Sequence, residues 1–96
     1  MFNELIEVYL KDAKQLIERI QRSILENDAK GLHYAAHRLK GSSLNLGAGL
    51  LADQCRELES LGRAGTTAGA WGWYQKALHE FERVTQALEI ELRTRV

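Results

Sequence analysis

Apolar residues recur every three or four positions along almost the whole of this chain, which is the spacing of one face of an α-helix. The 96 residues include no proline, so no helix is interrupted by a proline. No segment alternates apolar and polar residues in the way that is typical of a strand. The pattern therefore predicts an all-α protein with long helices.

The first half of the chain contains two predicted helices. The apolar stripe of the first consists of Leu5, Tyr9, Ala13, Leu16, Ile17, Ile20 and Ile24. Asn3 is its expected N-cap. The second helix is expected from about Lys30 to Leu46, with Asp28 as its N-cap and Gly47 just beyond its end. Its predicted buried stripe consists of Leu32, Ala36, Leu39, Ser43 and Leu46.

The second half adds two more helices, separated by a loop that we expect from Gly62 to Gly69. One face of the third helix carries Leu51, Cys55, Leu58 and Gly62. The stripe of the fourth consists of Trp71, Tyr74, Leu78, Phe81, Val84, Leu88 and Leu92. This places Trp71 in the core and leaves Trp73 half-exposed. Four amphipathic helices with short connections predict an antiparallel up-down four-helix bundle, and 96 residues allow one domain, 1–96.

Charge and composition limit the kinds of partner that we expect. Thirteen basic and thirteen acidic side chains give a formal net charge of zero, and no basic stripe suggests a nucleic-acid partner. No apolar run approaches the roughly 20 residues that cross a bilayer, so direct membrane contact is not expected. The first residues lack the pattern of a secretory signal. The single cysteine, Cys55, is expected to be an inert core thiol and fits a reducing, cytoplasmic location.

Three residues of the second helix form a surface patch that is suited to a chemical reaction. His37, Lys40 and Gly41 are three and four positions apart and so share one helix face. His37 lies about 200° around the helix from Leu39 and therefore points away from the buried stripe. A glycine inside a helix costs about 1 kcal/mol relative to alanine, which indicates that something must approach His37 closely. A nucleophile, a cation and an open space suit the acceptance of a phosphoryl group.

The sequence around this patch resembles a known signature. The runs His37-Arg38-Leu39-Lys40-Gly41-Ser42 and Asn45-Leu46-Gly47-Ala48 are similar to the phosphoacceptor motif of histidine-containing phosphotransfer (Hpt) domains. The resemblance implies that His37 is phosphorylated and that Lys40 and Gly41 support it. It also implies that Glu59 hydrogen-bonds the imidazole from the neighbouring helix. Such a carboxylate favours the tautomer with hydrogen on Nδ1, leaving Nε2 as the nucleophile. The alternative for Glu59 is a solvated helix residue.

The resemblance further implies a partner, the receiver domain, and two phosphoryl transfers. A receiver domain donates the phosphoryl group from an aspartyl phosphate, and an aspartate of another receiver accepts it later. The receiver brings the Mg²⁺, so no cofactor is expected in this chain. Because no glycine-rich phosphate loop is present, the domain is expected to be a relay without kinase activity of its own. The expected partner surface consists of His33, Tyr34, Arg38, Gly41 and Leu44.

Other interpretations remain open from the sequence. A non-catalytic helical adaptor would use the same exposed face for docking alone. The phosphoacceptor domain of a chemotaxis-type kinase would require downstream kinase domains, which this chain lacks. His33 and His37 have the spacing of a helical metal pair, but no third ligand is near in sequence, so no metal site is expected. His79 is expected to be an exposed helix residue. The domain fits either a separate protein or the C-terminal part of a hybrid sensor kinase whose parent chain lies at the inner membrane.

Overall fold

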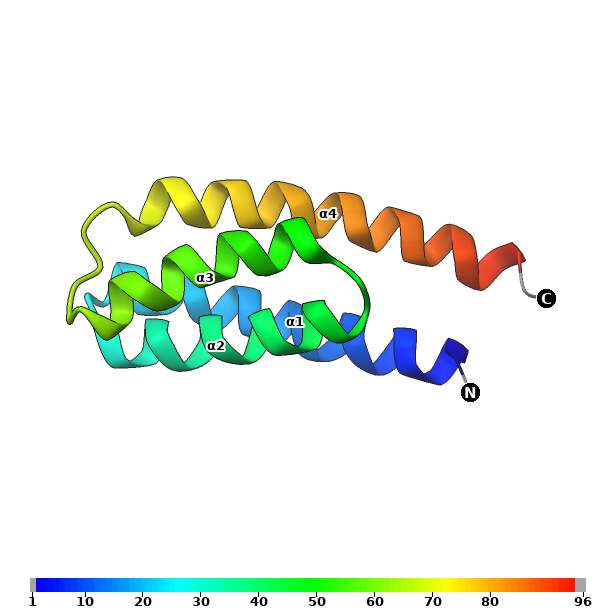
Figure 1. The fold of residues 1–96 in the computed structure, drawn as a ribbon, viewed down its shortest axis with the longest axis horizontal. Helices are drawn as coiled ribbons and strands as arrows, with labels where there is room; N and C mark the ends of the chain where they lie inside the picture. The colour runs from blue at the N-terminus through cyan, green and yellow to red at the C-terminus, as the bar shows by residue number, and fades with distance from the viewer. Residues whose placement is uncertain (1, 95–96) are drawn as a thin grey trace.

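The computed structural model describes residues 2–94 as four helices joined by short connections. The helices are α1 (Phe2–Leu25), α2 (Ala29–Asn45), α3 (Gly49–Arg63) and α4 (Ala70–Thr94). Figure 1 shows them lying side by side, with both ends of the chain at the same end of the bundle. Within residues 2–94, no helix has the combination of length and apolar character that crossing a membrane requires.

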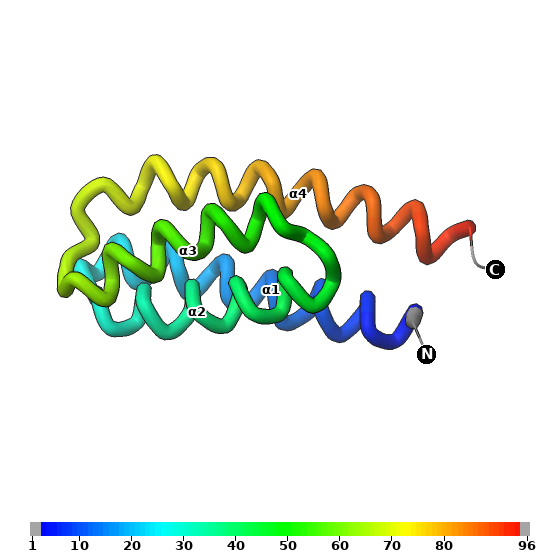
Figure 2. Tube along the Cα trace, in the orientation of Figure 1, coloured from blue at the N-terminus to red at the C-terminus, as the bar shows by residue number. Residues whose placement is uncertain are grey.

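The helices form a closed ring. Each packs against the next in the chain, and α1 also packs against α4. The connections are short, so successive helices run in opposite directions. The predicted antiparallel up-down four-helix bundle is therefore confirmed. α1 and α4 are the longer pair and extend beyond α2 and α3 at the end that carries the termini (Figure 2).

The core follows the predicted stripes with two exceptions. The fully buried large side chains include Ile6, Ile20, Leu32, Leu39, Leu51 and Leu58. Leu5 was expected in the core but is 59% exposed, and its neighbour Ile6 is buried instead. Trp71 was also expected in the core but is 42% exposed, since Ala70 takes the buried position beside Tyr74. Both errors arise because residues three and four positions from a core residue fit helical spacing equally well.

The ends of the helices show which capping predictions hold. The Asp28 side chain caps α2 by accepting a hydrogen bond from the backbone N–H of Gly31 at 3.0 Å. Gly47 follows the last residues of α2 with a φ of +78°, the left-handed conformation that favours glycine at this position. The prediction for Asn3 is wrong, because α1 already includes Phe2 and Asn3 lies inside the helix.

Gly62 is not the start of the loop but a buried residue of α3, which continues to Arg63. A Cβ atom built on Gly62 would lie 2.6 Å from the backbone nitrogen of His33 and 2.7 Å from the carbonyl oxygen of Ala29. Both atoms belong to the backbone of α2, so a side chain here would force the two helices apart. Gly62 therefore sets the close approach of α2 and α3 on which the site described below depends.

Gly62→Ala is expected to destabilise the domain by about 1–3 kcal/mol, the usual cost of inserting a methyl group where backbone atoms cannot move aside. The unfolding free energy from urea titration measures this. Gly72→Ala in α4 is the matched control, because a Cβ there meets nothing within 4 Å. That variant should be as stable as wild type or up to about 1 kcal/mol more stable. Equal stability of Gly62→Ala and wild type would contradict a need for glycine between the helices.

Candidate functional site

His37 lies on the outer surface of α2, as its spacing from Leu39 predicts. Its side chain is 63% exposed, whereas Leu39 is fully buried. Gly41, one turn further along, is exposed, and a Cβ atom built on it would meet nothing within 4 Å. The imidazole is therefore open to a second molecule from the side where Gly41 carries no side chain.

Glu59 of α3 contacts the imidazole of His37 from the buried side. Its residue is 2% exposed, and Nδ1 of His37 lies 2.7 Å from its Oε2 atom. Nζ of Lys40 donates to its Oε1 atom at 2.6 Å, and Nη2 of Arg63 donates to Oε2 at 3.3 Å. Glu59 is thus not a solvated helix residue. It is a buried carboxylate that joins His37 to two cations.

This contact determines which imidazole nitrogen faces outward with a free lone pair. A carboxylate accepts hydrogen bonds, so the 2.7 Å contact assigns the hydrogen of a neutral His37 to Nδ1. The exposed Nε2 atom then carries the lone pair that a nucleophile needs. Burial by itself would raise the pKa of the Glu59 carboxyl, but hydrogen bonds from Lys40 and His37 and their charges lower that pKa below its ordinary value. The carboxylate therefore stays ionised at neutral pH.

His33 lies one turn before His37 and is half-buried. Its Nδ1 atom lies 3.3 Å from the backbone carbonyl oxygen of Glu59, which accepts a hydrogen from it. The two imidazole rings are nearly parallel, with centroids 6.2 Å apart and planes inclined by 14°. Among residues 2–94, no group of three or more His, Cys, Asp or Glu side chains is placed to hold a metal ion.

The remaining residues of the expected partner surface are exposed near His37. Tyr34 is 43% exposed and Leu44 is 51% exposed. Nη1 of Arg38 donates to the Tyr34 hydroxyl at 3.1 Å. Sequence reasoning missed Arg63, although its position four residues after Glu59 is a recognised spacing for an ion pair on a helix. It also missed Arg19 of α1, whose guanidinium carbon lies 5.3 Å from the centroid of the Tyr34 ring and whose position carried no local signal in the sequence.

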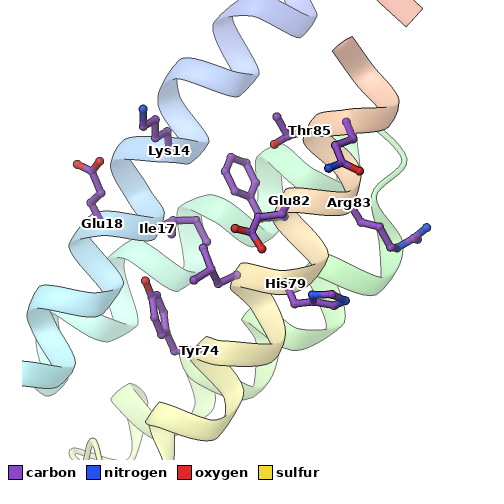
Figure 3. Close-up of a pocket in the computed structure, with 11 residues that line it drawn as sticks. Lys14, Ile17, Glu18, Tyr74, His79, Glu82, Arg83 and Thr85 are labelled. Carbon is purple, nitrogen blue, oxygen red and sulfur yellow. The ribbon is translucent and has the colours of Figure 1, made fainter. Parts of the chain in front are cut away.

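Two other residues singled out in the sequence stand apart from this chemistry. Cys55 is fully buried, and burial together with the negative charge of Glu59 raises the pKa of its thiol to about 12, so it stays protonated. His79 is exposed on α4 and lines a groove of about 710 Å³ between α1 and α4. Figure 3 shows Ile17 and Tyr74 between the two helices in this groove. The groove lies across the bundle from His37, and none of the residues around Glu59 lines it.

Comparisons with known proteins identify the family of this chain. The family profile of the Hpt domain matches residues 4–93. Histidine-containing phosphotransfer protein 4 of Arabidopsis thaliana is 28% identical over 88 residues, which cover 90% of this chain and 69% of that protein. The crystal structure of histidine-containing phosphotransfer protein B from Pseudomonas aeruginosa PAO1 superposes with a TM-score of 0.93 at 29% identity, covering 97% of this chain and 81% of the other.

The fold of four antiparallel helices is thus shared with a solved phosphotransfer protein. The chain belongs to the Hpt domain family. It is a histidine phosphotransfer module of a two-component phosphorelay, a system in which Hpt proteins interact with receiver domains.

The lowered pKa of Glu59 predicts how stability depends on pH. Glu59→Gln removes the charge that Lys40 and His37 bind, so at pH 7 the variant should be less stable by about 1–3 kcal/mol. A carboxyl with a lowered folded-state pKa stabilises the fold above its unfolded-state pKa of about 4.3, and this contribution is lost as the pH falls through the folded-state value. Urea unfolding of both proteins from pH 7 to pH 3 measures the difference.

We expect the stability gap between wild type and Glu59→Gln to be constant near neutral pH and to shrink below about pH 4.3. Asp53→Asn is the control, since the Asp53 side chain is 63% exposed and pairs with Arg56 at the surface. A gap for Glu59→Gln that does not change with pH would show that the carboxylate charge contributes nothing to folding.

Proposed function

We propose that His37 is the phosphoacceptor of this Hpt module. It takes a phosphoryl group from the aspartyl phosphate of one receiver domain and passes it to the aspartate of another. The observation that supports this most directly is the 2.7 Å contact between Nδ1 of His37 and the buried Glu59, which leaves Nε2 exposed as the nucleophile. Exposure of the ring beside the bare Gly41 gives a receiver access to it.

In the proposed transfer, Nε2 attacks phosphorus in line with the aspartyl oxygen that leaves. The N–P bond forms as the P–O bond breaks, and the receiver regains a free carboxylate. No proton has to leave Nε2 beforehand, because the hydrogen of the neutral ring is on Nδ1. The Nδ1–H group becomes more acidic as the ring gains positive character, and Glu59 stabilises that charge. The return transfer to a second receiver reverses these steps.

The groups of this chain supply positioning and part of the charge stabilisation. Lys40 is 22% exposed at its side chain and keeps N–H donors beyond the one that binds Glu59. We propose that these donors bind the phosphoryl group on the neighbouring ring. We propose that the Mg²⁺ ion comes with the receiver, because catalysis of phosphoryl transfer consists mainly of positioning and electrostatics and the receiver holds the acyl phosphate.

We place this activity in the cytoplasm, where a lone thiol such as Cys55 stays reduced. A separate protein and the terminal part of a hybrid kinase are both compatible with the proposed role. The alternative function is a helical adaptor that docks on its partner without accepting phosphate. The two functions differ in one measurable property, the appearance of acid-labile, base-stable phosphate on the domain.

His37→Gln is expected to abolish labelling by a phosphorylated receiver while leaving the helical circular dichroism signal intact, since the side chain is exposed. His79→Gln, on the opposite side of the bundle, is the control and should be labelled like wild type. Autoradiography with an acid and base stability test measures the label. Phosphate on His33 or His79 in the variant, or no label on wild type with any receiver of the source organism, would refute the assignment.

Lys40→Ala is expected to slow transfer by about tenfold or more without unfolding the domain. Loss of a charge-assisted hydrogen bond to the phosphoryl group costs about 1–3 kcal/mol. Rapid-quench kinetics measures the rate, with Lys14→Ala, an exposed lysine of α1, as the control. Transfer at the wild-type rate in Lys40→Ala would remove this residue from the mechanism.

A further inference from the structure

The positive side chains on the two sides of His37 differ in whether their charge is already neutralised. On the α3 side, Lys40 and Arg63 both bind the Glu59 carboxylate. On the α1 side, Arg19 and Arg38 have no ion pair with any carboxylate in residues 2–94. The unneutralised positive charge beside the imidazole therefore lies toward α1.

Helix geometry places these side chains on opposite flanks of the imidazole. Each residue advances about 100° around an α-helix. Relative to His37, Arg38 lies about 100° to one side and Tyr34 about 60° to the same side. Lys40 lies about 60° to the other side, which is the side that Glu59 occupies. A partner that approaches over His37 and Gly41 thus meets Lys40 on one flank and Tyr34 with Arg38 on the other.

Arg19, Tyr34 and Arg38 form one contact group, which we call the Tyr34 cluster. The guanidinium carbon of Arg19 lies 5.3 Å from the centroid of the Tyr34 ring, and that of Arg38 lies 5.6 Å from it. Arg38 also donates to the Tyr34 hydroxyl at 3.1 Å. These contacts hold two long, flexible side chains near fixed positions. Less conformational entropy is then lost when a partner binds them.

The Tyr34 cluster borders a groove between α1 and α2 of about 460 Å³. The groove adds a third arginine, Arg22, but it also contains Asp12 and Glu18. Carboxylates of this kind would repel a continuous polyanion such as a nucleic acid. Alternating charges on a shaped surface instead suit a folded protein that presents separate acidic side chains.

We propose that the Tyr34 cluster is a docking and selectivity surface for acidic side chains of the receiver domain that exchanges its phosphoryl group with His37. The proposal deepens the function proposed above and rests on it. Charge complementarity between the arginines and acidic side chains favours the receiver as the partner at this surface. A receiver brings to His37 an acyl phosphate together with the carboxylates that hold its magnesium ion, so acidic side chains lie on the face that it presents. Guanidinium groups match carboxylates in geometry as well as charge.

The test compares a receiver with a donor that does not dock. The double variant Arg19→Glu/Arg38→Glu reverses both charges. The control Lys14→Glu/Arg93→Glu makes the same change in net charge at exposed positions outside the Tyr34 cluster and its groove. Each protein is labelled by phosphoramidate, a small phosphoryl donor, and by receiver domains of the source organism charged with acetyl phosphate. The receiver that transfers fastest to wild type is used for full kinetics.

In the cluster variant, we expect the receiver-driven rate divided by the phosphoramidate-driven rate to fall by at least tenfold. The loss should appear as a higher half-saturating concentration of receiver rather than a lower rate at saturation. Added salt should slow transfer to wild type more than transfer to the variant, since charge steering is screened. The control variant should keep the wild-type ratio.

Two results would overturn the proposal: an unchanged ratio in the cluster variant, or an equal fall in both variants. A loss confined to the saturating rate would also overturn it, because the cluster would then act on the chemistry of His37 rather than on docking. Failure of the proposed function itself has a different signature. Wild type would then take no label on His37 from phosphoramidate or from any receiver. Circular dichroism of both double variants verifies that the bundle is folded.

Discussion

The arrangement of side chains around His37 depends on the buried carboxylate of Glu59. A buried carboxylate is costly unless charged or hydrogen-bonding partners surround it. Here those partners come from two helices, with His37 and Lys40 on α2 and Arg63 on α3. The same contacts that make burial of Glu59 tolerable also determine how the imidazole is oriented. Removal of any one of them takes a partner from the buried carboxylate and loosens the arrangement of the site.

The contacts of Glu59 require α2 and α3 to stay close together, and the packing around them provides this. Gly62 allows the backbone of α3 to approach that of α2 next to His33, whose ring is held by the Glu59 carbonyl group. Elsewhere along α2, the buried Ser43 hydroxyl and the Tyr9 hydroxyl lie 3.0 Å apart, which ties the helix to α1. A site built on packed helices keeps its geometry better than one built on loops. In the proposed transfer, this rigidity positions one atom, Nε2 of His37, for the receiver domain.

The distribution of charge around His37 separates two tasks. On the α3 side, Lys40 and Arg63 form ion pairs with Glu59, which in turn contacts the imidazole of His37. On the α1 side, the arginines of the Tyr34 cluster are held by an aromatic ring rather than by a carboxylate, so their charge remains available to another molecule. A chain with zero net charge thus carries two arginines without a carboxylate partner, among the residues that the structure describes, on one side of His37.

The amino-acid sequence by itself determined the helical class, the four segments and most of the core, because the spacing of apolar residues records which face of each helix is buried. It also determined that His37 points outward, that Asp28 caps the start of α2 and that Gly47 follows the end of the same helix, since these depend on local geometry. Its predictions that Leu5 and Trp71 are buried were wrong, because Ile6 and Ala70 fit helical spacing equally well and only packing against neighbouring helices separates the members of each pair. The sequence left Glu59 either solvated or bound to His37, and gave no sign of Arg19. Only the tertiary structure decided these, since each depends on the distance between side chains of different helices.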